Sequence, residues 1–298
     1  MPDFIVIGAM KSATTTLHEQ LRRQRGLLMS QTKEPNFFSD DENYAKGLQW
    51  YASCFPPATQ DGLRGESSTH YTKLPAYPHT VQRMKSALPR VKLIYLMRHP
   101  IDRLISHYLH ELTVGQASGG LEEAVARHQE LVDYGRYSYQ LEPYIKAYGC
   151  QSVLPVFFDR LVAEPDEELK RIGRYLGTPE PLCWDHTIGA QNVGRERLRS
   201  GHVRNVLVQS PVLAPLRRIF IPKRFSERLK ALWRFRMDRP EIPPRLYARL
   251  RLAFDEDLAR LGSWLGVALD CESFHEVASG SPRCWTQVES SRSLTCQF

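Results

Sequence analysis

The first residues of the chain place the strongest limit on its fold. Phe4-Ile5-Val6-Ile7 is a short, continuous apolar run, typical of a buried parallel strand, and Gly8 follows it directly. Residues 14–25 then carry Leu17 and Leu21 four positions apart, which predicts a helix. A buried strand that passes through a glycine turn into a helix is the opening unit of an α/β fold.

Apolar runs and helical patterns continue to alternate along the chain. We predict further strands at residues 27–29, 91–97 and 152–158, and further helices at 100–112, 164–176 and 244–265. Such alternation produces a parallel sheet covered on both faces. We therefore predict an α/β, P-loop-like three-layer fold with a central, mostly parallel sheet flanked by helices, over residues 1–268. Residues 269–298, rich in Ser and Thr, predict a loosely held tail.

Composition narrows the class of protein. With 298 residues, 42% hydrophobic and 24% charged, the chain matches an ordinary globular protein. No stretch approaches about 18 uninterrupted apolar residues, so we expect no transmembrane helix. A strand-like run starts at Asp3, so we expect no signal peptide and a cytoplasmic protein. Its six cysteines are scattered without C-x-x-C or zinc spacing, and we expect them to be reduced.

The positive charge is local. The net charge is +7, but residues 195–239 hold 13 Lys and Arg against three acidic residues, or +10, and the rest of the chain sums to −3. Phe225, Leu229 and Trp233 fall at helical spacing among these cations, which favours peripheral membrane contact through 216–236 or an acidic partner. A solvated helix packed on the core fits the pattern equally well. No nucleic-acid-binding motif accompanies the charge, so we expect no nucleic acid partner.

The loop after the first strand has the composition of an anion site. Lys11, Ser12 and three threonines, Thr14 to Thr16, open the helix, where unpaired N–H groups and a partial positive charge favour phosphate or sulfate. The Walker A loop uses the same physics, but Met10 stands where its glycine before lysine belongs. The next long strand ends in Arg98, where a magnesium-binding site needs an aspartate. An ordinary strand–turn–helix with a solvated Lys11 is the alternative.

A second segment points to a particular anion. Arg98 at a strand end and Ser106 two turns into the next helix can converge on one phosphate. Together with the first loop, they resemble the sulfotransferases that use 3′-phosphoadenosine-5′-phosphosulfate (PAPS). In that family the lysine loop binds the 5′-phosphosulfate and an Arg…Ser pair of this spacing binds the 3′-phosphate.

Further segments resemble the heparan sulfate N- and 3-O-sulfotransferase branch and its bacterial relatives. They are Lys33-Glu34-Pro35-Asn36-Phe37-Phe38, Gly47-Leu48-Gln49-Trp50-Tyr51, Gly65-Glu66-Ser67-Ser68-Thr69-His70-Tyr71, Phe158-Asp159-Arg160-Leu161 and Arg174-Tyr175-Leu176-Gly177. The resemblance covers about residues 3–268. Three positions depart from the pattern. Ala13 replaces a glycine, a small change that backbone binding should survive. Ser67 replaces a lysine that contacts acceptor or sulfate, and Asn36 replaces the histidine of the 3-O enzymes, and these two changes argue against a heparan-type acceptor.

The resemblance implies roles for individual residues. Glu34 would be the general base, with a pKa raised by nearby phosphates, and Lys11 would stabilise charge on the leaving phosphate. The donor PAPS and the product adenosine-3′,5′-bisphosphate (PAP) would be bound by Lys11, Ser12, Ala13, Thr14, Thr15, Thr16, Arg98, Ser106 and, on a basic closing loop, Arg199. No metal is expected, because Lys and Arg take its role. The acceptor would be a hydroxyl or amine of a carbohydrate, lipid or natural product, anionic or membrane-associated in some cases.

Alternatives stay open for several of these residues. Glu34 can be a plain surface residue at the turn before Pro35, and His70 is a rival base on a loop facing the same cleft. His99 can cap the helix or pack beside Arg98. The aromatic residues of 37–51 are more often core than substrate contacts. For the whole chain, the rivals are a P-loop kinase or other phosphotransferase, and a non-catalytic module that binds acidic polymers or membranes.

Overall fold

The computed structural model describes residues 1–57, 62–188, 197–198, 234–235 and 239–286. Arg199, residues 287–298 and nearly all of the basic segment, including the predicted membrane-facing stretch apart from 234–235, lie outside the described residues.

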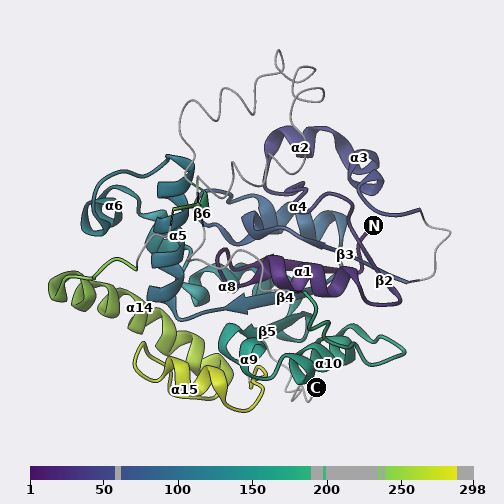
Figure 1. Ribbon diagram of the computed structural model, residues 1–298. Helices are drawn as coiled ribbons and strands as arrows, with labels where there is room; N and C mark the ends of the chain where they lie inside the picture. The colour runs from purple at the N-terminus through teal and green to yellow at the C-terminus, as the bar shows by residue number, and fades with distance from the viewer. Residues whose placement is uncertain (58–61, 189–196, 199–233, 236–238, 287–298) are drawn as a thin grey trace.

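Five parallel strands form the central sheet in the order β2-β3-β1-β4-β5 (Figure 1). They are β1 (Phe4–Gly8), β2 (Leu27–Met29), β3 (Leu63–Ser67), β4 (Lys92–Met97) and β5 (Val153–Phe157). The predicted α/β sheet and its four predicted strands are confirmed. The third strand, β3, was not predicted, because its sequence Leu-Arg-Gly-Glu-Ser has neither an apolar run nor a clean alternation.

Alternate residues of the strands face two separate hydrophobic layers. Ile5 and Ile7 of β1 point toward one layer, whereas Phe4 and Val6 point toward the other. The first layer holds α4 (Thr80–Ala87), α5 (Pro100–Val114), α8 (Tyr137–Tyr148) and α14 (Pro244–Leu265), and the second holds α1 (Thr14–Arg22), α9 (Phe158–Ala163) and α10 (Pro165–Leu176). Figure 1 shows the sheet between α1 in front and α4 behind. The predicted three-layer arrangement follows from this period of two.

The helices lie close to their predicted positions. Those on the α1 side are α1 (Thr14–Arg22), α9 (Phe158–Ala163) and α10 (Pro165–Leu176). The remainder are α2 (Asp41–Ala45), α3 (Gly47–Ser53), α4 (Thr80–Ala87), α5 (Pro100–Val114), α6 (Leu121–Arg127), α7 (Glu130–Asp133), α8 (Tyr137–Tyr148), α14 (Pro244–Leu265) and α15 (Phe274–Ser279), with the 3₁₀ turns η1 (Thr69–Thr72) and η2 (Cys150–Ser152). The predicted helix 244–265 coincides with α14, although its Leu252 is 77% exposed and does not join the core.

Residues 269–286 differ from the loosely held tail that we predicted. Phe274 and Ala278 of α15 are buried, and Trp285 is buried with its indole N–H donating to the carbonyl of Val153 on β5. Leu269 and Cys271 are buried as well, and these five residues are spaced irregularly among polar residues, so they give no periodic signal but together fix the segment to the core.

Two smaller features complete the described structure. Arg197–Leu198 (β6) and Arg234–Phe235 (β7) pair as a short antiparallel ribbon, which brings the two ends of the basic segment together. None of the described helices is long and apolar enough to span a bilayer.

Candidate active site

The loop after β1 has an unusual backbone. A Cβ on Gly8 would come within 2.0 Å of the Thr72 hydroxyl oxygen, so only glycine fits where β1 ends. Lys11 and Ala13 then take left-handed conformations with φ of 71° and 65°. Left-handed residues before a helix turn backbone N–H groups toward a common point, the geometry of an anion-binding nest. The loop is therefore shaped by its backbone as much as by its lysine.

The helix that follows has an N-terminus suited to an anion. No side chain caps α1 at Ala13, and its first turn carries no acidic residue. The N–H groups of a first turn have no partner within their own helix, so an anion can bind there. Thr14 is buried, whereas Thr15 and Thr16 are partly exposed at this end of the helix.

Two buried donors next to this loop lack partners. Ser12 is fully buried, and its Oγ has no hydrogen bond of good geometry within the described part of the chain, although it lies beside the Tyr137 phenol. Nε of Arg98, at the end of β4, is equally buried and unpartnered there. Tyr137 donates to the carbonyl of Arg98, which fixes the position of that residue. Since buried donors are rarely left unsatisfied, both fit a ligand that brings acceptor oxygens.

Ser106 lies on α5, the helix that follows Arg98, about two turns from its first residue, Pro100. It is partly exposed and already contacts other protein groups. The Arg98 guanidinium lies 4.8 Å above the centre of the Phe158 ring. The predicted donor residues on β1, β4 and their following segments therefore lie at the same, carboxyl edge of the sheet.

Glu34 occupies the segment between β2 and α2, also at this edge. Its backbone is left-handed, with φ of 59°, and its N–H donates to the carbonyl of Ser67 over 3.0 Å. Thr69 donates to Oε2 over 3.2 Å, and Lys33 lies 2.6 Å from Oε1. A left-handed glutamate costs on the order of 1 kcal/mol, and such residues cluster at functional sites.

We predicted a raised pKa for Glu34 beside the anionic groups of a ligand, whereas without a ligand its pKa is lowered. Burial raises this pKa, but the opposing charge and hydrogen bond of Lys33, with smaller contributions from His70 and Lys73, bring it below its usual value. Glu34 is therefore ionised at neutral pH. The prediction counted the anions that a ligand would bring and overlooked the neighbouring cations.

His70 and Lys73 line the same region. Burial and the Lys73 charge lower the pKa of His70 to about 4, so this ring is neutral at pH 7, and it stacks on Tyr77 at 5.0 Å. Burial lowers the pKa of Lys73 to about 8, against the opposing effect of Glu34. The structure thus brings both predicted base candidates into one electrostatic group.

Comparison with known proteins decides the family. The sulfotransferase domain model matches residues 1–190, which is more than half of the chain. The chain belongs to the sulfotransferase family. It is 30% identical over 203 residues to mouse heparan sulfate glucosamine 3-O-sulfotransferase 3A1, covering 65% of this chain and 50% of the relative.

Other relatives agree with this assignment. The chain is 26% identical over 197 residues to the bifunctional heparan sulfate N-deacetylase/N-sulfotransferase 1 of Caenorhabditis elegans, covering 60% of this chain and 22% of that protein. It therefore spans about half the length, or less, of these curated relatives. A sulfotransferase structure from Alicyclobacillus acidocaldarius shares the fold, with a TM-score of 0.65, 21% identity, and coverage of 90% of this chain and 97% of that one.

Glu66 lies within one of the family-like segments, but its sequence context predicted no role for it. Its carboxylate is fully buried and accepts hydrogen bonds from Tyr51, Tyr71 and Ser68. Ser68 in turn accepts from the N–H of Asn36 over 3.2 Å. Burial raises the pKa of Glu66 to about 7 in spite of these donors. Glu66 thereby links the end of β3 to the segment that carries Glu34. The sequence signal that could have indicated its role is an acidic residue within a short strand.

The three departures from the family pattern have structural counterparts. Ala13 adopts the left-handed conformation that favours glycine. Ser67, in place of lysine, is fully buried and bonded to Nδ1 of His18 over 3.0 Å. Asn36 is also left-handed, with φ of 51°, which asparagine tolerates better than histidine. Phe37 and Tyr51 are buried and stacked, as expected of core residues.

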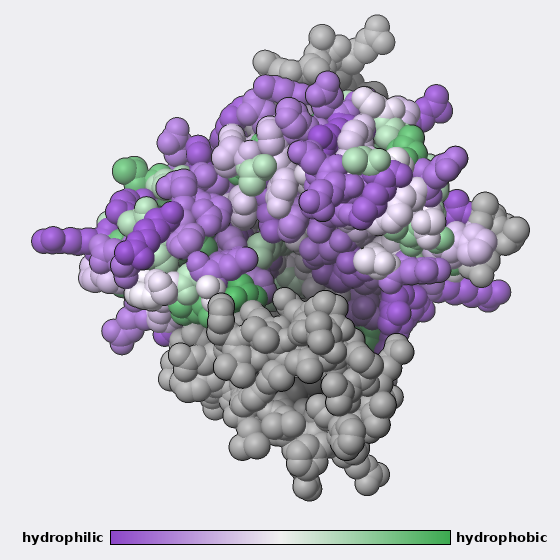
Figure 2. Space-filling model, turned by 90° about the horizontal axis from the view of Figure 1, so that it is seen from above, coloured by the Kyte–Doolittle hydropathy of each residue, from purple (hydrophilic) through white to green (hydrophobic). Residues whose placement is uncertain are grey.

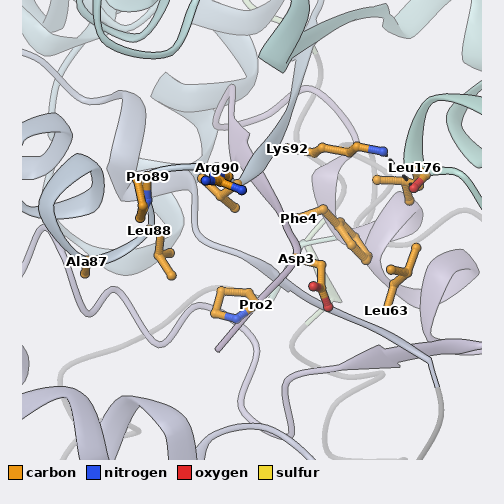
Figure 3. Close-up of a pocket in the computed structure, with 11 residues that line it drawn as sticks. Pro2, Asp3, Phe4, Leu63, Ala87, Leu88, Pro89, Arg90, Lys92 and Leu176 are labelled. Atoms are coloured by element: carbon orange, nitrogen blue, oxygen red, sulfur yellow. Dashed lines mark hydrogen bonds between the residues drawn. The ribbon is translucent and has the colours of Figure 1, made fainter.

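The surface adds two observations. In the view of Figure 2 the described residues are mainly hydrophilic, with hydrophobic side chains in separate spots and no broad apolar patch. A hollow of about 600 Å³ lies between Pro2, Phe4, Pro89 and Lys92, at the amino ends of β1 and β4 (Figure 3). Because ligands of parallel α/β sheets bind at the carboxyl ends, this hollow is separate from the site described above.

Proposed function

We propose that this chain transfers the sulfuryl group from PAPS to a hydroxyl or amine of a carbohydrate, lipid or small natural product. The observation that carries the proposal is a pair of buried donors without a hydrogen-bond partner among the described residues, Ser12 Oγ in the loop before the uncapped start of α1 and Arg98 Nε directly after β4. Two separate sets of donors suit a ligand with two anionic groups, such as PAPS with its 5′-phosphosulfate and 3′-phosphate.

The donor would be held by charge and by backbone N–H groups. Lys11, Ser12 and the first turn of α1 would bind the 5′-phosphosulfate, and Arg98 with Ser106 would bind the 3′-phosphate. The strands on either side of β1 end in Ser67 and in Met97, which precedes Arg98. An arginine at this place suits a second phosphate and opposes a magnesium ion, which disfavours the kinase alternative.

On the acceptor side, Glu34 would accept the proton. As the acceptor oxygen or nitrogen forms its bond to sulfur, the O–H or N–H electron pair is released and Glu34 takes the proton. The bond between sulfur and the 5′-phosphate oxygen breaks, and its electron pair stays on PAP, where Lys11 balances the charge. Because the lysines keep Glu34 ionised before substrates bind, the base is ready at neutral pH.

A carbohydrate acceptor is favoured by the names of the relatives, which act on heparan sulfate. The buried Ser67 cannot supply the positive charge that the lysine provides in the glycan enzymes. In this chain Lys33 and Lys73 lie near the base in its place. An acceptor that carries a negative group beside its reacting hydroxyl would match these two lysines.

Ligand binding tests the donor first. We expect PAP to bind the full chain in isothermal titration calorimetry far more tightly than ATP with magnesium, and preference for ATP would overturn the proposal. Lys11→Ala should abolish turnover of labelled PAPS across a panel of glycans, lipids and phenols, with Lys85→Ala on α4 as the control. Unchanged turnover in Lys11→Ala would contradict the role given to Lys11, and no turnover by the parent chain with any acceptor would support a non-catalytic binding module.

A further inference from the structure

A cluster of metal-ligating side chains lies beside the donor site and has no part in the proposed transfer. His99 and Asp102 come from the start of α5, and His275 comes from α15, which packs next to α9 (Figure 1). Each of the three can offer one ligand atom, and these atoms lie within 4.8 Å of one another. The two imidazole rings are nearly parallel, at 11°, with centres 4.7 Å apart.

His99 is prepared as a ligand by its surroundings. It is only 7% exposed, and its Nε2 lies 3.0 Å from the carbonyl oxygen of Cys271. A carbonyl accepts only, so Nε2 carries the proton and the lone pair is on Nδ1. Nδ1 is buried and has no hydrogen-bond partner within the described residues. A histidine that donates one ring N–H to a backbone carbonyl and leaves its other nitrogen open is the usual arrangement of a metal ligand.

The predicted capping role of His99 does not account for this arrangement. His99 stands at the N-cap of α5, but its side chain makes no cap hydrogen bond and packs against Phe274 and His275. Its open nitrogen therefore requires another explanation.

The charges around His275 favour a cation. Asp102 lies 3.8 Å from its Nε2, and Asp159 lies 3.3 Å from its Nδ1. Arg239 also contacts Asp102, but this side chain is 62% exposed and can turn into solvent. The two carboxylates outnumber the one arginine that contacts them, and a divalent cation would offset this excess of negative charge.

We propose that His99, Asp102 and His275 form a binding site for a divalent transition-metal ion of the zinc type, which serves structure and not sulfuryl transfer. Imidazole nitrogen and carboxylate oxygen are preferred ligands of zinc, which binds three such ligands and a water in open sites. Bonds of about 2.1 Å place ligand atoms roughly 3.4 Å apart, so the cluster must contract. His275 is 55% exposed and sits on a short helix, which leaves it free to approach.

Binding there would join α15 to the start of α5. His99 follows Arg98 directly, so the metal would restrain the residue proposed to bind the 3′-phosphate. It would also add a bond between α5 and the segment 269–286, which buried core residues already hold. The expected effect is a higher melting temperature and little change in the chemical step.

The experiment uses the full chain without a histidine tag, stripped with a chelator. Titration with zinc chloride should give one equivalent of saturable binding and a rise in the melting temperature, and cobalt(II) should give visible absorption bands typical of nitrogen ligation. His275→Ala should weaken zinc binding by about 100-fold, since loss of even an outer-sphere partner costs roughly 10- to 100-fold. His275 is exposed, so this variant should fold and bind PAP.

The matched control is His186→Ala, which removes another exposed histidine, 3.1 Å from the carboxylate of Asp166. This variant should still bind one equivalent of zinc with the affinity of the parent chain. Asp102→Asn provides a second variant that removes a ligand without touching an imidazole, and it too should weaken binding. The proposal is overturned if zinc binds without saturation at one equivalent, or if His275→Ala and Asp102→Asn both retain the affinity of the parent chain.

Discussion

Two carboxylates of the same edge of the sheet, Glu34 and Glu66, have opposite environments. Glu66 is fully buried, and its hydrogen-bond partners are the neutral hydroxyls of Tyr51, Tyr71 and Ser68. Glu34 lies nearer the surface, and Lys33 makes an ion pair with it. Burial raises the pKa of Glu66 to about 7, whereas the cations lower that of Glu34 in spite of its burial.

The difference shows how one short region can hold a structural and a reactive carboxylate. Hydroxyl groups donate hydrogen bonds to the Glu66 carboxylate, but they carry no positive charge that would offset the cost of burying an anion. Glu66 therefore suits a positioning role, through Ser68 and the N–H of Asn36. Glu34 stays ionised and within reach of a substrate, which suits a base.

The largest effect is expected from Glu34→Gln. Glutamine keeps the shape and can still accept from Thr69, but it cannot take a proton, so kcat should fall roughly 10²- to 10⁴-fold. PAP affinity and melting temperature should change little. Steady-state kinetics with labelled PAPS measures the loss, and Glu42→Gln on the exposed face of α2 is the control. A variant that keeps more than about a tenth of the activity would show that the base lies elsewhere.

Glu66→Gln should change the pH dependence of stability. The folded pKa of about 7 exceeds the usual carboxyl value, so the folded state binds the Glu66 proton more tightly than the unfolded state does. The resulting stability is fully present below the unfolded pKa and is lost as pH rises toward 7. Over this window the loss is roughly 3 kcal/mol by linkage.

The glutamine variant mimics the protonated form and should lack this loss. Urea unfolding at pH 5 and pH 8 measures the difference, with Glu34→Gln as the control, because the pKa of Glu34 is lowered and its effect on stability falls at more acidic pH, outside this window. Equal slopes for the parent chain and Glu66→Gln would mean that Glu66 stays ionised in the folded protein.

The sequence allowed the fold to be predicted better than the strained parts of the site. The apolar runs of β1, β4 and β5 and the leucine spacing of α14 are local signals, and they fixed the sheet and its covering helices. By contrast β3 pairs through a polar sequence, because Gly65 makes room for the Phe4 ring, which a Cβ would approach to 2.1 Å. Such a requirement arises only once the neighbouring strand is in place.

The site residues also fall into those that the sequence predicts and those that depend on tertiary contacts. The Lys11 loop and Arg98 stand next to strand ends, so their meeting at one edge follows from parallel topology. The partners of Glu34 come from the contact between two segments distant in sequence, and its pKa depends on the balance among them. The link from Glu66 through Ser68 and the stacking of His99 on His275 likewise depend on tertiary contacts that no spacing rule encodes.

Lys33→Met should move the acid limb of the pH–rate profile. Lys33 holds the pKa of Glu34 down, so its removal raises that pKa, and activity should be lost at a higher pH on acidification. We expect the acid limb of kcat/KM to move toward higher pH. The control is Lys46→Met, which removes an exposed lysine between α2 and α3 and should leave the acid limb of the pH–rate profile in place. An unmoved limb in Lys33→Met would assign it to another group.

The smallest effect is expected from His70→Phe, which tests whether the neutral imidazole between these groups shares the work of Glu34. Phenylalanine keeps a ring to stack on Tyr77 but has no nitrogen, so kcat should fall less than about tenfold. The decisive measurement is the double variant with Glu34→Gln. If the two residues act independently, the residual rate should equal that of Glu34→Gln lowered by the factor that His70→Phe shows alone, because independent effects add within roughly 0.5 kcal/mol. Further loss in the double variant would make His70 the substitute base, because a group with a pKa near 4 can still accept a proton once the stronger carboxylate is gone.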